Sequence, residues 1–329
     1  MKGNAGLLVM RLIGISLLAV FACASSAQVP HDDVVRLNEF YRLSAQIEDG
    51  LWPGWSKVPD PVLLVTADAE FLTHFPTVPE KFTASSDGFV TRPRVFDPHL
   101  LATFPAFGAP SVIVVGKPAM TLIKTRTPWI IVLMHEHFHQ LQYAQPGYWD
   151  AVNGLGLAHG DTSGMWMLNY PFPYARPEVS ASFGELRDQL LVALRAPDGE
   201  KFKASAARYV ELRQKFLAQL SADDRKYLNF QLWQEGMARY VQIKAAEAAA
   251  TYQPTGEYKA LANYESFDAY AKRARTETLN ELQGIDIAKA QRVVVYSFGA
   301  TEGLLLDRLH PQWRNAYFAH LLSTDALFD

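Results

Sequence analysis

Four polar side chains that can bind metals or move protons lie within five residues of one another: His135, Glu136, His137 and His139. They directly follow the apolar segment WIIVLM (129–134), and burying such groups is costly unless they find partners. A helix brings residues i and i+4 onto one face, so His135 and His139 can hold one metal ion between them. Glu136 lies beside that face, where its carboxylate can act as general base on a metal-activated water.

This spacing is the H-E-x-x-H pattern of zinc hydrolases, which requires the motif to lie on a helix. Thr127 and Pro128 predict the start of such a helix, with a hydroxyl at the N-cap and proline at the first helical position. The helix is expected to cover Pro128–Tyr143. His137 lies about 200° around it from His135. We therefore expect His137 to be a structural histidine and not a ligand of the same metal.

A catalytic zinc ion usually has three protein ligands and one open position. An extended H-E-x-x-H-x-x-G-x-x-H site would need a glycine and a histidine where the chain has Gln142 and Gln145, so that class is excluded. The third ligand must then come from further along the chain. The carboxylates considered are Asp161, Glu178, Glu185 and Glu235.

Glu235 is the favoured third ligand. It lies in a predicted long helix, Asp223–Ala249, and is followed by Gly236 and Ala238. Small residues there would let a second helix approach closely, as two helices that share a metal must. The competing interpretation is an i,i+4 ion pair between Glu235 and Arg239 on a solvated face.

The two motifs together, HEHFH (135–139) and QEGMA (234–238), resemble those of the gluzincin zinc metallopeptidases, which include the thermolysin-like proteases and the zinc aminopeptidases. In that group a later helix carries the glutamate ligand, often in an N-E-G-x-A-like stretch. The resemblance implies one Zn²⁺ bound by His135, His139 and Glu235, with Glu136 as general base for peptide hydrolysis. The spacer of residues 140–234 is longer than in the best-known members, so Asp161 and Glu185 stay open as ligands.

The resemblance also implies a tyrosine that stabilises the oxyanion of the transition state, downstream of the glutamate ligand. Tyr296 is the candidate for this catalytic role, and the alternative is a core tyrosine with a satisfied hydroxyl. Tyr240 and His310 are weaker candidates. Gly299 and Gly303, four residues apart, predict a close helix contact nearby. Carboxylates that could orient the zinc-binding histidines are Asp161, Glu185 and Glu302.

The remaining pattern predicts an α+β protein that is mainly α-helical. A region of strands and loops (28–126) is expected to pack on a helical, zincin-like catalytic region (127–329). The predicted strands are Pro61–Asp68 and Ser111–Lys117. The helices predicted after the first are Val179–Arg195, Glu200–Leu220, Asp223–Ala249, Ser266–Leu282 and Ile287–Leu309. Ser111–Lys117 could pair with an extended peptide as an edge strand. An aromatic loop (166–174) could line a substrate subsite.

The N-terminal residues indicate where the protein is located, and the net charge indicates which partners it lacks. Lys2 and Arg11, an apolar run (12–22) and small residues up to Ala27 predict a signal peptide over residues 1–27, and so a secreted or periplasmic protein. The apolar run is too short for a transmembrane helix. The single cysteine, Cys23, offers a lipid anchor as an alternative. A net charge of −3 with interspersed signs indicates no nucleic-acid partner.

The sequence therefore predicts an exported zinc metallopeptidase that acts on a peptide or protein substrate. Two alternatives remain: a non-catalytic exported binding protein that contains zinc, and a zinc hydrolase of a non-peptide amide or ester. The intact Glu136 argues against the first alternative, since a purely structural zinc site has no use for that carboxylate. No segment of the kind that binds a substrate amino terminus is found, so the motifs do not indicate an exopeptidase.

Overall fold

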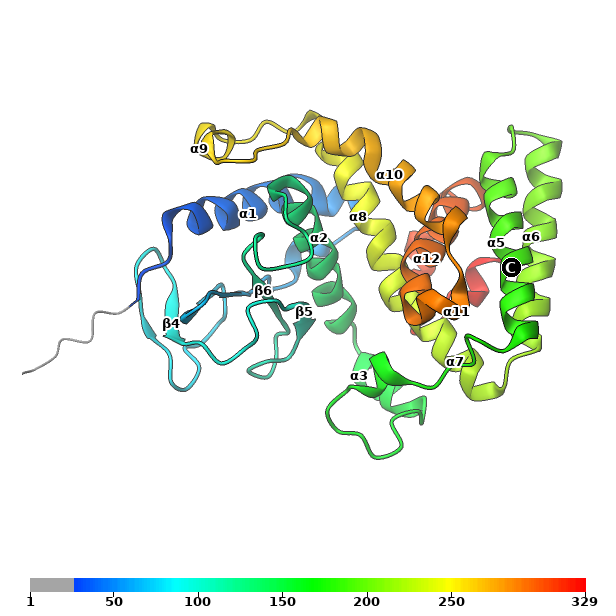
Figure 1. Ribbon diagram of the computed structural model, residues 1–329, viewed down its shortest axis with the longest axis horizontal. Coiled ribbons are helices and arrows are strands. Elements are labelled where there is room, and N and C mark those ends of the chain that lie inside the picture. Colours follow the sequence, from blue (N-terminus) through cyan, green and yellow to red (C-terminus); the bar gives the residue numbers. More distant parts are fainter. Residues whose placement is uncertain (1–26) are drawn as a thin grey trace, which may run out of the picture.

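A computed structural model describes residues 27–329 of the chain, as a mainly helical protein with one small sheet near its N-terminal end (Figure 1). This confirms the predicted α+β, mainly α class. The leader predicted for residues 1–27 and Cys23 lie, apart from Ala27, outside the described residues. Within residues 27–329, no helix is long and apolar enough to cross a membrane.

The sheet has six strands in the order β3-β4-β2-β1-β6-β5. Only β1 and β6 run parallel, and the other neighbouring pairs are antiparallel. Both predicted strands are confirmed as this parallel pair, and every residue of both is buried. The strands are β1 Val62–Val65, β2 Ala69–Thr73, β3 Thr83–Ala84, β4 Val90–Pro93, β5 Leu101–Phe104 and β6 Val112–Gly116.

The prediction that Ser111–Lys117 forms an edge strand is wrong. The strand β6 lies between β1 and β5, and both neighbours take its backbone hydrogen bonds. A strand of five buried β-branched and small residues suits the middle of a sheet covered on both faces. The edge on this side is β5, a short and half-buried strand.

The N-terminal region is not made of strands and loops alone, because it begins with the 21-residue helix α1. The buried residues of α1 recur at helical spacing, but many of them are polar. Asp33, Arg36, Glu39, Ser44 and Glu48 are all buried in this helix. An apolar pattern could not reveal a helix whose buried face carries so many charged and polar groups.

Four of the six predicted helices match observed helices closely, namely α2, α5, α6 and α10, whereas the short helices α3, α4, α9 and α13 were not predicted. The helices of the described chain are α1 His31–Leu51, α2 Arg126–Tyr143, α3 Tyr148–Gly154, α4 Trp166–Asn169, α5 Pro177–Arg195, α6 Glu200–Ala218, α7 Ala222–Gln231, α8 Met237–Ala248, α9 Gly256–Ala260, α10 Phe267–Gly284, α11 Ile287–Ala290, α12 Val294–Leu309 and α13 Arg314–Tyr317.

Two predicted helices are interrupted. A π-helical turn, Leu232–Gly236, separates α7 from α8 within the predicted helix Asp223–Ala249. The predicted helix Ile287–Leu309 is broken at Gln291, whose φ is 49°, between α11 and α12. Thr127 is also not an N-cap, since α2 begins at Arg126 and the Thr127 hydroxyl donates to the carbonyl of Glu265.

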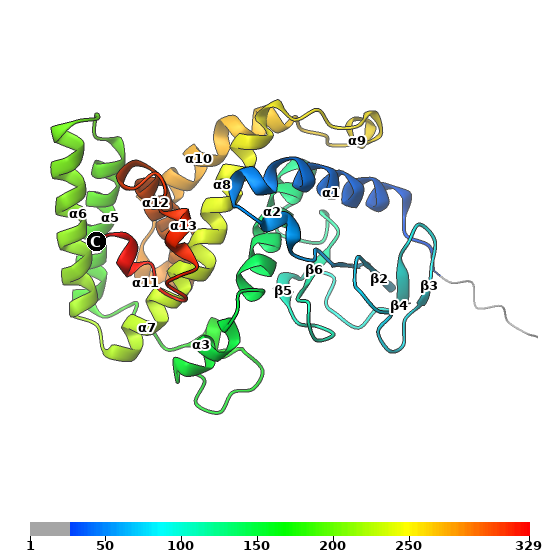
Figure 2. The same ribbon diagram turned by 180° about the vertical axis from the view of Figure 1, so that it is seen from behind.

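The helix α2 lies between the sheet and α8 (Figures 1 and 2). It packs against β5 and β6 on one side and against α8 on another, while the antiparallel pair α5 and α6 stands at the far end of the molecule. One continuous hydrophobic core joins sheet residues such as Val62 and Ile113 to Phe138 of α2 and Trp233 of the π-helical turn. The central position of α2 lets it present side chains to both parts.

Two glycine contacts bring α12 close to the segment that carries Glu235. A Cβ on Gly236 would lie 2.7 Å from the Cα of Gly299, and one on Gly303 would lie 2.7 Å from the ring of Tyr240. The contact predicted at Gly299 and Gly303 is therefore confirmed. The small residues after Glu235 were predicted to let the histidine-bearing helix approach. This was wrong for Gly236, because the helix that packs closely against it is α12 and not α2.

Candidate metal centre

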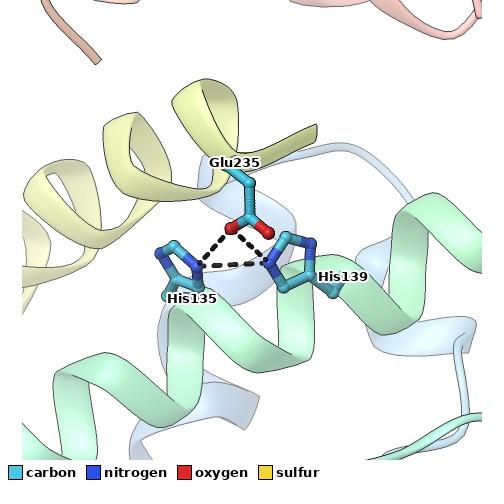
Figure 3. Close-up of side chains that lie close together, drawn as sticks. All are labelled: His135, His139 and Glu235. Carbon is cyan, nitrogen blue, oxygen red and sulfur yellow. Dashed lines mark hydrogen bonds and ion pairs between the residues drawn. The ribbon is translucent and has the colours of Figure 1, made fainter. Parts of the chain in front are cut away.

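Three side chains from distant parts of the chain point toward one another: His135 and His139 of α2 and Glu235 of the π-helical turn (Figure 3). The two Nε2 atoms lie 3.2 Å apart. Glu235 Oε2 lies 3.7 Å from His135 Nε2 and 3.4 Å from His139 Nε2. The structure thus brings together the three residues that the sequence predicted as ligands, and the group could hold a metal ion.

The donor triangle has the dimensions of one face of a tetrahedral zinc site. With zinc–nitrogen and zinc–oxygen bonds of about 2.0–2.1 Å, neighbouring donors of a regular tetrahedron stand about 3.3 Å apart. The three separations, 3.2, 3.4 and 3.7 Å, bracket that value. Two imidazoles and one carboxylate with an open fourth position are the donor set of catalytic zinc. The residues present therefore fit zinc.

His139 and Glu235 shift each other's pKa values, because both side chains are buried. His135 and His139 are 6% and 4% exposed. Burial disfavours the charged form of His139, but the Glu235 carboxylate outweighs it and raises the pKa of His139 to about 8. Burial also disfavours the Glu235 carboxylate, yet the two histidines hold the pKa of Glu235 well below its usual value. The carboxylate is therefore ionised and ready to bind a cation.

The π-helical turn that carries Glu235 is itself a local irregularity of the chain. Such turns insert one extra residue into a helix and are frequent at functional sites. The turn faces α2, since the Gln142 amide lies 3.0 Å from the carbonyl of Trp233 and 3.1 Å from that of Gln234. Propensity and periodicity predict a continuous helix here, so the turn could not be foreseen from the sequence.

Glu136 lies beside the donor triangle on α2 and is 6% exposed. Its Oε2 accepts a hydrogen bond of 2.8 Å from Thr103 Oγ1, which also lies 3.0 Å from the Glu136 carbonyl. Thr103 belongs to the edge strand β5. The sequence offered no signal for Thr103, because its contact with Glu136 depends on how the sheet packs against α2.

Tyr296 also lies at the site. Its ring stacks on the ring of His135, with centroids 6.2 Å apart and an interplanar angle of 27°. Its hydroxyl accepts a 3.1 Å hydrogen bond from Arg292 Nη2, and Arg292 Nη1 lies 3.6 Å from Glu235 Oε1. Burial and the Glu235 charge raise the pKa of Tyr296, which keeps its hydroxyl proton. The predicted role of Tyr296 toward an oxyanion stays a prediction, and Arg292 was missed.

The other candidate ligands and catalytic residues are engaged elsewhere. Asp161 accepts from the backbone of Ser163 and Trp166, and Glu178 and Glu185 form exposed ion pairs with arginines. Tyr240 donates to Asp307, and His310 is exposed at the end of α12. The alternative pairing of Glu235 with Arg239 is not formed, because Arg239 pairs with Glu281.

The carboxylates predicted to orient the histidines do not do so. Glu302 is fully buried but accepts hydrogen bonds from Tyr209 and Arg213, and no carboxylate contact to a ring Nδ1 of His135 or His139 is found among residues 27–329. Gln142 takes that place instead, with its Oε1 2.7 Å from His139 Nδ1. The signal in the sequence was a glutamine three residues after the histidine.

His137 is structural, as predicted. It faces away from the donor triangle, where its Nδ1 lies 2.8 Å from Gln140 Oε1 and its Nε2 lies 3.3 Å from Glu48 Oε2. Its ring stacks on Trp55 with centroids 5.0 Å apart. The helix α1 thus supplies the partner that makes a buried His137 tolerable.

The aromatic loop packs on α7, where Trp166 stacks on Phe230 and Tyr170 stacks on Tyr227. Its role in lining a substrate subsite stays a prediction. Tyr143, which the sequence did not single out, stacks on His139, with centroids 5.8 Å apart.

Relatives offer no guide to this centre, so its interpretation rests on the residues and their geometry. The donor triangle is the evidence for a metal site. No model of a protein family, no curated protein and no solved structure matches the chain.

Proposed function

We propose that this protein is an exported zinc-dependent metallopeptidase of the gluzincin type, with a zincin-like catalytic region. The observation that carries the proposal is the buried triangle of His135, His139 and Glu235 with Glu136 beside it. The two short motifs and the predicted leader support the same assignment.

Each residue at the site has a chemical role in this proposal. Zinc held by the triangle would supply Lewis acidity toward water and the substrate carbonyl. Glu136 takes a proton from the attacking water and passes it to the leaving amine. Thr103 holds the Glu136 carboxylate in place through its hydroxyl. Tyr296, whose own oxygen accepts from Arg292, is free to donate its proton to the developing oxyanion.

The edge strand β5 favours a peptide as the substrate. One side of β5 pairs with β6, and its other side is the free edge of the sheet. An extended peptide can add to such an edge through main-chain hydrogen bonds. Thr103 of this strand touches Glu136, so a peptide paired with β5 would run past the general base. A small non-peptide amide would have no use for this edge.

The number of protein ligands favours a catalytic metal site over a purely structural one. The group offers three protein ligands, whereas structural zinc is usually closed by a fourth. A carboxylate held next to the open position, as Glu136 is, serves no purpose in a structural site.

The test is zinc content and cleavage of a peptide library by wild type, Glu136→Gln and a control, Glu185→Gln. We expect one zinc in all three, and a fall in cleavage of about 10²-fold or more only in Glu136→Gln, since that is the usual contribution of a general base. Glu185 is an exposed partner of Arg208, so its loss should change neither. Zinc bound by wild type without cleavage of any peptide would instead favour the non-catalytic binding protein.

A further inference from the structure

The sequence HEHFHQLQ (135–142) contains one pattern twice, a histidine followed three residues later by a glutamine. His137 pairs with Gln140, and His139 pairs with Gln142. Residues i and i+3 of a helix are neighbours, so each glutamine lies beside its histidine. In both pairs the histidine Nδ1 faces the glutamine Oε1, at 2.8 and 2.7 Å. Both copies of the pattern therefore form the same contact, a glutamine oxygen facing a histidine Nδ1, on two different faces of α2.

The surroundings of Gln142 determine which way its amide points. Its nitrogen lies 3.0 Å from the carbonyl oxygen of Trp233 and 3.1 Å from that of Gln234. Carbonyl oxygens only accept hydrogen bonds, so the NH₂ group must face them and Oε1 must face His139. The Tyr317 hydroxyl, 2.7 Å from the same nitrogen, donates to Trp233 and can accept from Gln142. The side chain is fully buried, and water cannot take over these contacts.

The fixed amide in turn determines the state of His139. An oxygen at 2.7 Å from Nδ1 requires the proton on that nitrogen, since Oε1 has none to give. When the ring is neutral, as a metal ligand must be, its lone pair therefore lies on Nε2, the atom that faces His135 and Glu235. The neutral ring is thereby held in the tautomer that can bind a metal.

Gln142 also connects the two arms of the donor triangle. Its oxygen holds a ligand on α2, while its nitrogen holds the π-helical turn at the two residues directly before Glu235. A shift of the turn away from α2 would break these bonds. One side chain thus sets the orientation of His139 and the distance of Glu235 from it.

His135 has no equivalent partner. The residue three positions later is Phe138, and within the described chain the buried His135 Nδ1 has no hydrogen-bond partner. The orientation of His135 depends on packing, including the stacked Tyr296 ring. His139 is therefore the one histidine of the triangle whose tautomer is set by a hydrogen bond.

We propose that Gln142 is the positioning residue of the metal centre, which holds His139 in its metal-binding tautomer and ties the Glu235 turn to α2. The inference rests on the metal site of the proposed function, but not on the reaction. Gln140 provides a matched control, because it is equally buried on the same helix, accepts from His137 and donates to the carbonyls of Pro61 and Ser111. Gln140 thus forms the same kinds of hydrogen bond as Gln142, but with a histidine that is not a proposed metal ligand.

The experiment measures zinc affinity by chelator competition in wild type, Gln142→Leu, Gln142→Glu and Gln140→Leu. We expect Gln142→Leu to bind zinc about 10–100-fold more weakly, as for lost outer-shell partners of metal ligands. Gln140→Leu should lower thermal stability and leave zinc affinity unchanged. Gln142→Glu restores the acceptor for His139 but not the donors to the turn, so its affinity should lie between those of wild type and Gln142→Leu.

A spectrum of the wild-type protein tests the same idea without any substitution. Long-range ¹H–¹⁵N correlations of the zinc-loaded protein should show the His139 proton on Nδ1 and the metal on Nε2. Zinc on Nδ1, equal affinities of wild type and Gln142→Leu, or equal losses in Gln140→Leu and Gln142→Leu would each overturn the proposal. Wild type that binds no zinc would overturn the metal site as well, whereas zinc binding without peptide cleavage would count against the proposed reaction alone.

Discussion

The Glu136 carboxylate is held by a hydrogen bond from Thr103, a residue far from it in the sequence. Thr103 Oγ1 lies 2.8 Å from Glu136 Oε2, and it reaches this carboxylate from a different element of the fold. A general base must be held within hydrogen-bonding reach of the water it deprotonates. At the scale of single residues, the role proposed for Glu136 therefore depends on this contact with Thr103 as well as on the H-E-x-x-H motif.

Replacing Thr103 by valine should slow peptide hydrolysis and leave zinc binding intact. Valine keeps the shape of threonine but removes the hydroxyl, so the carboxylate loses its partner and is less well oriented. We expect kcat to fall about 10-fold, which is less than the roughly 10²–10⁴-fold that a general base contributes, because the Glu136 carboxylate itself is still present. Thr103→Ser keeps the hydroxyl and should retain most of the activity. Equal rates for the valine variant and wild type would show that Thr103 does not position Glu136.

The sequence predicted the residues of the site better than their surroundings. His135, His139 and Glu235 come together as predicted, because short motifs encode ligand chemistry directly. Thr103 and Arg292 went unnoticed, since a lone threonine or arginine carries no pattern. The outer partners of the histidines were sought among carboxylates, and a glutamine fills that role.

At the scale of elements, the contact between the π-helical turn and α12 sets the place of Glu235. Gly236 and Gly299 face each other so closely that a Cβ on Gly299 would lie 2.5 Å from the Cα of Gly236. A methyl group there would force the two backbones apart. Since Glu235 precedes Gly236 and Tyr296 lies on α12, such a shift would move both toward a different geometry.

Gly299→Ala should therefore destabilise the protein and weaken zinc binding. Overpacking of this kind costs about 1–3 kcal/mol. Gly184→Ala in α5 is the matched control, because a Cβ there meets nothing within 4 Å and alanine is favoured in helices by about 0.5–1 kcal/mol. Thermal unfolding and zinc titration of both variants check this. If Gly299→Ala were as stable as Gly184→Ala, the close approach would play no part in the site.

Helices and strands were predicted well from the sequence where their buried faces are apolar, and poorly where those faces are polar. Strands β1 and β6 and helices α5, α6 and α10 follow apolar patterns and were found close to their observed bounds. Helix α1 was missed because its buried face includes Asp33, Glu39 and Glu48. The other strands are short or half-buried, and their pairing depends on contacts that no local pattern encodes.

At the scale of the whole molecule, the carboxylate of Asp325 connects the C-terminal segment to two helices of the helical part. Asp325 accepts hydrogen bonds from Arg213 of α6 and from Arg225 and Asn229 of α7. Arg213 also binds the buried Glu302 of α12. Asp325 thus connects α6 to α7, and Arg213 connects the same cluster to α12, the helix that carries Tyr296.

This contact predicts a pH-dependent contribution to stability. Burial alone would raise the pKa of Asp325, but Arg213 and its other partners hold it below the usual value of 3.8. A carboxyl group with a lowered folded-state pKa stabilises the fold above its unfolded value and loses that effect as the pH falls through the folded value. Asp325→Asn should thus cost roughly 1–3 kcal/mol at pH 7. The difference from wild type, measured by urea unfolding, should shrink below about pH 4. A difference that stays constant down to pH 2 would show that the ionised Asp325 carboxylate does not stabilise the fold.

The most direct measurement of the metal centre is an anomalous difference map at the zinc absorption edge, from crystals grown with one equivalent of zinc. We expect one strong peak about 2.0–2.2 Å from His135 Nε2, His139 Nε2 and a carboxylate oxygen of Glu235. We also expect the fourth position of the metal to be open toward Glu136. A map with no peak in this triangle, or with zinc bound elsewhere in the molecule, would contradict it.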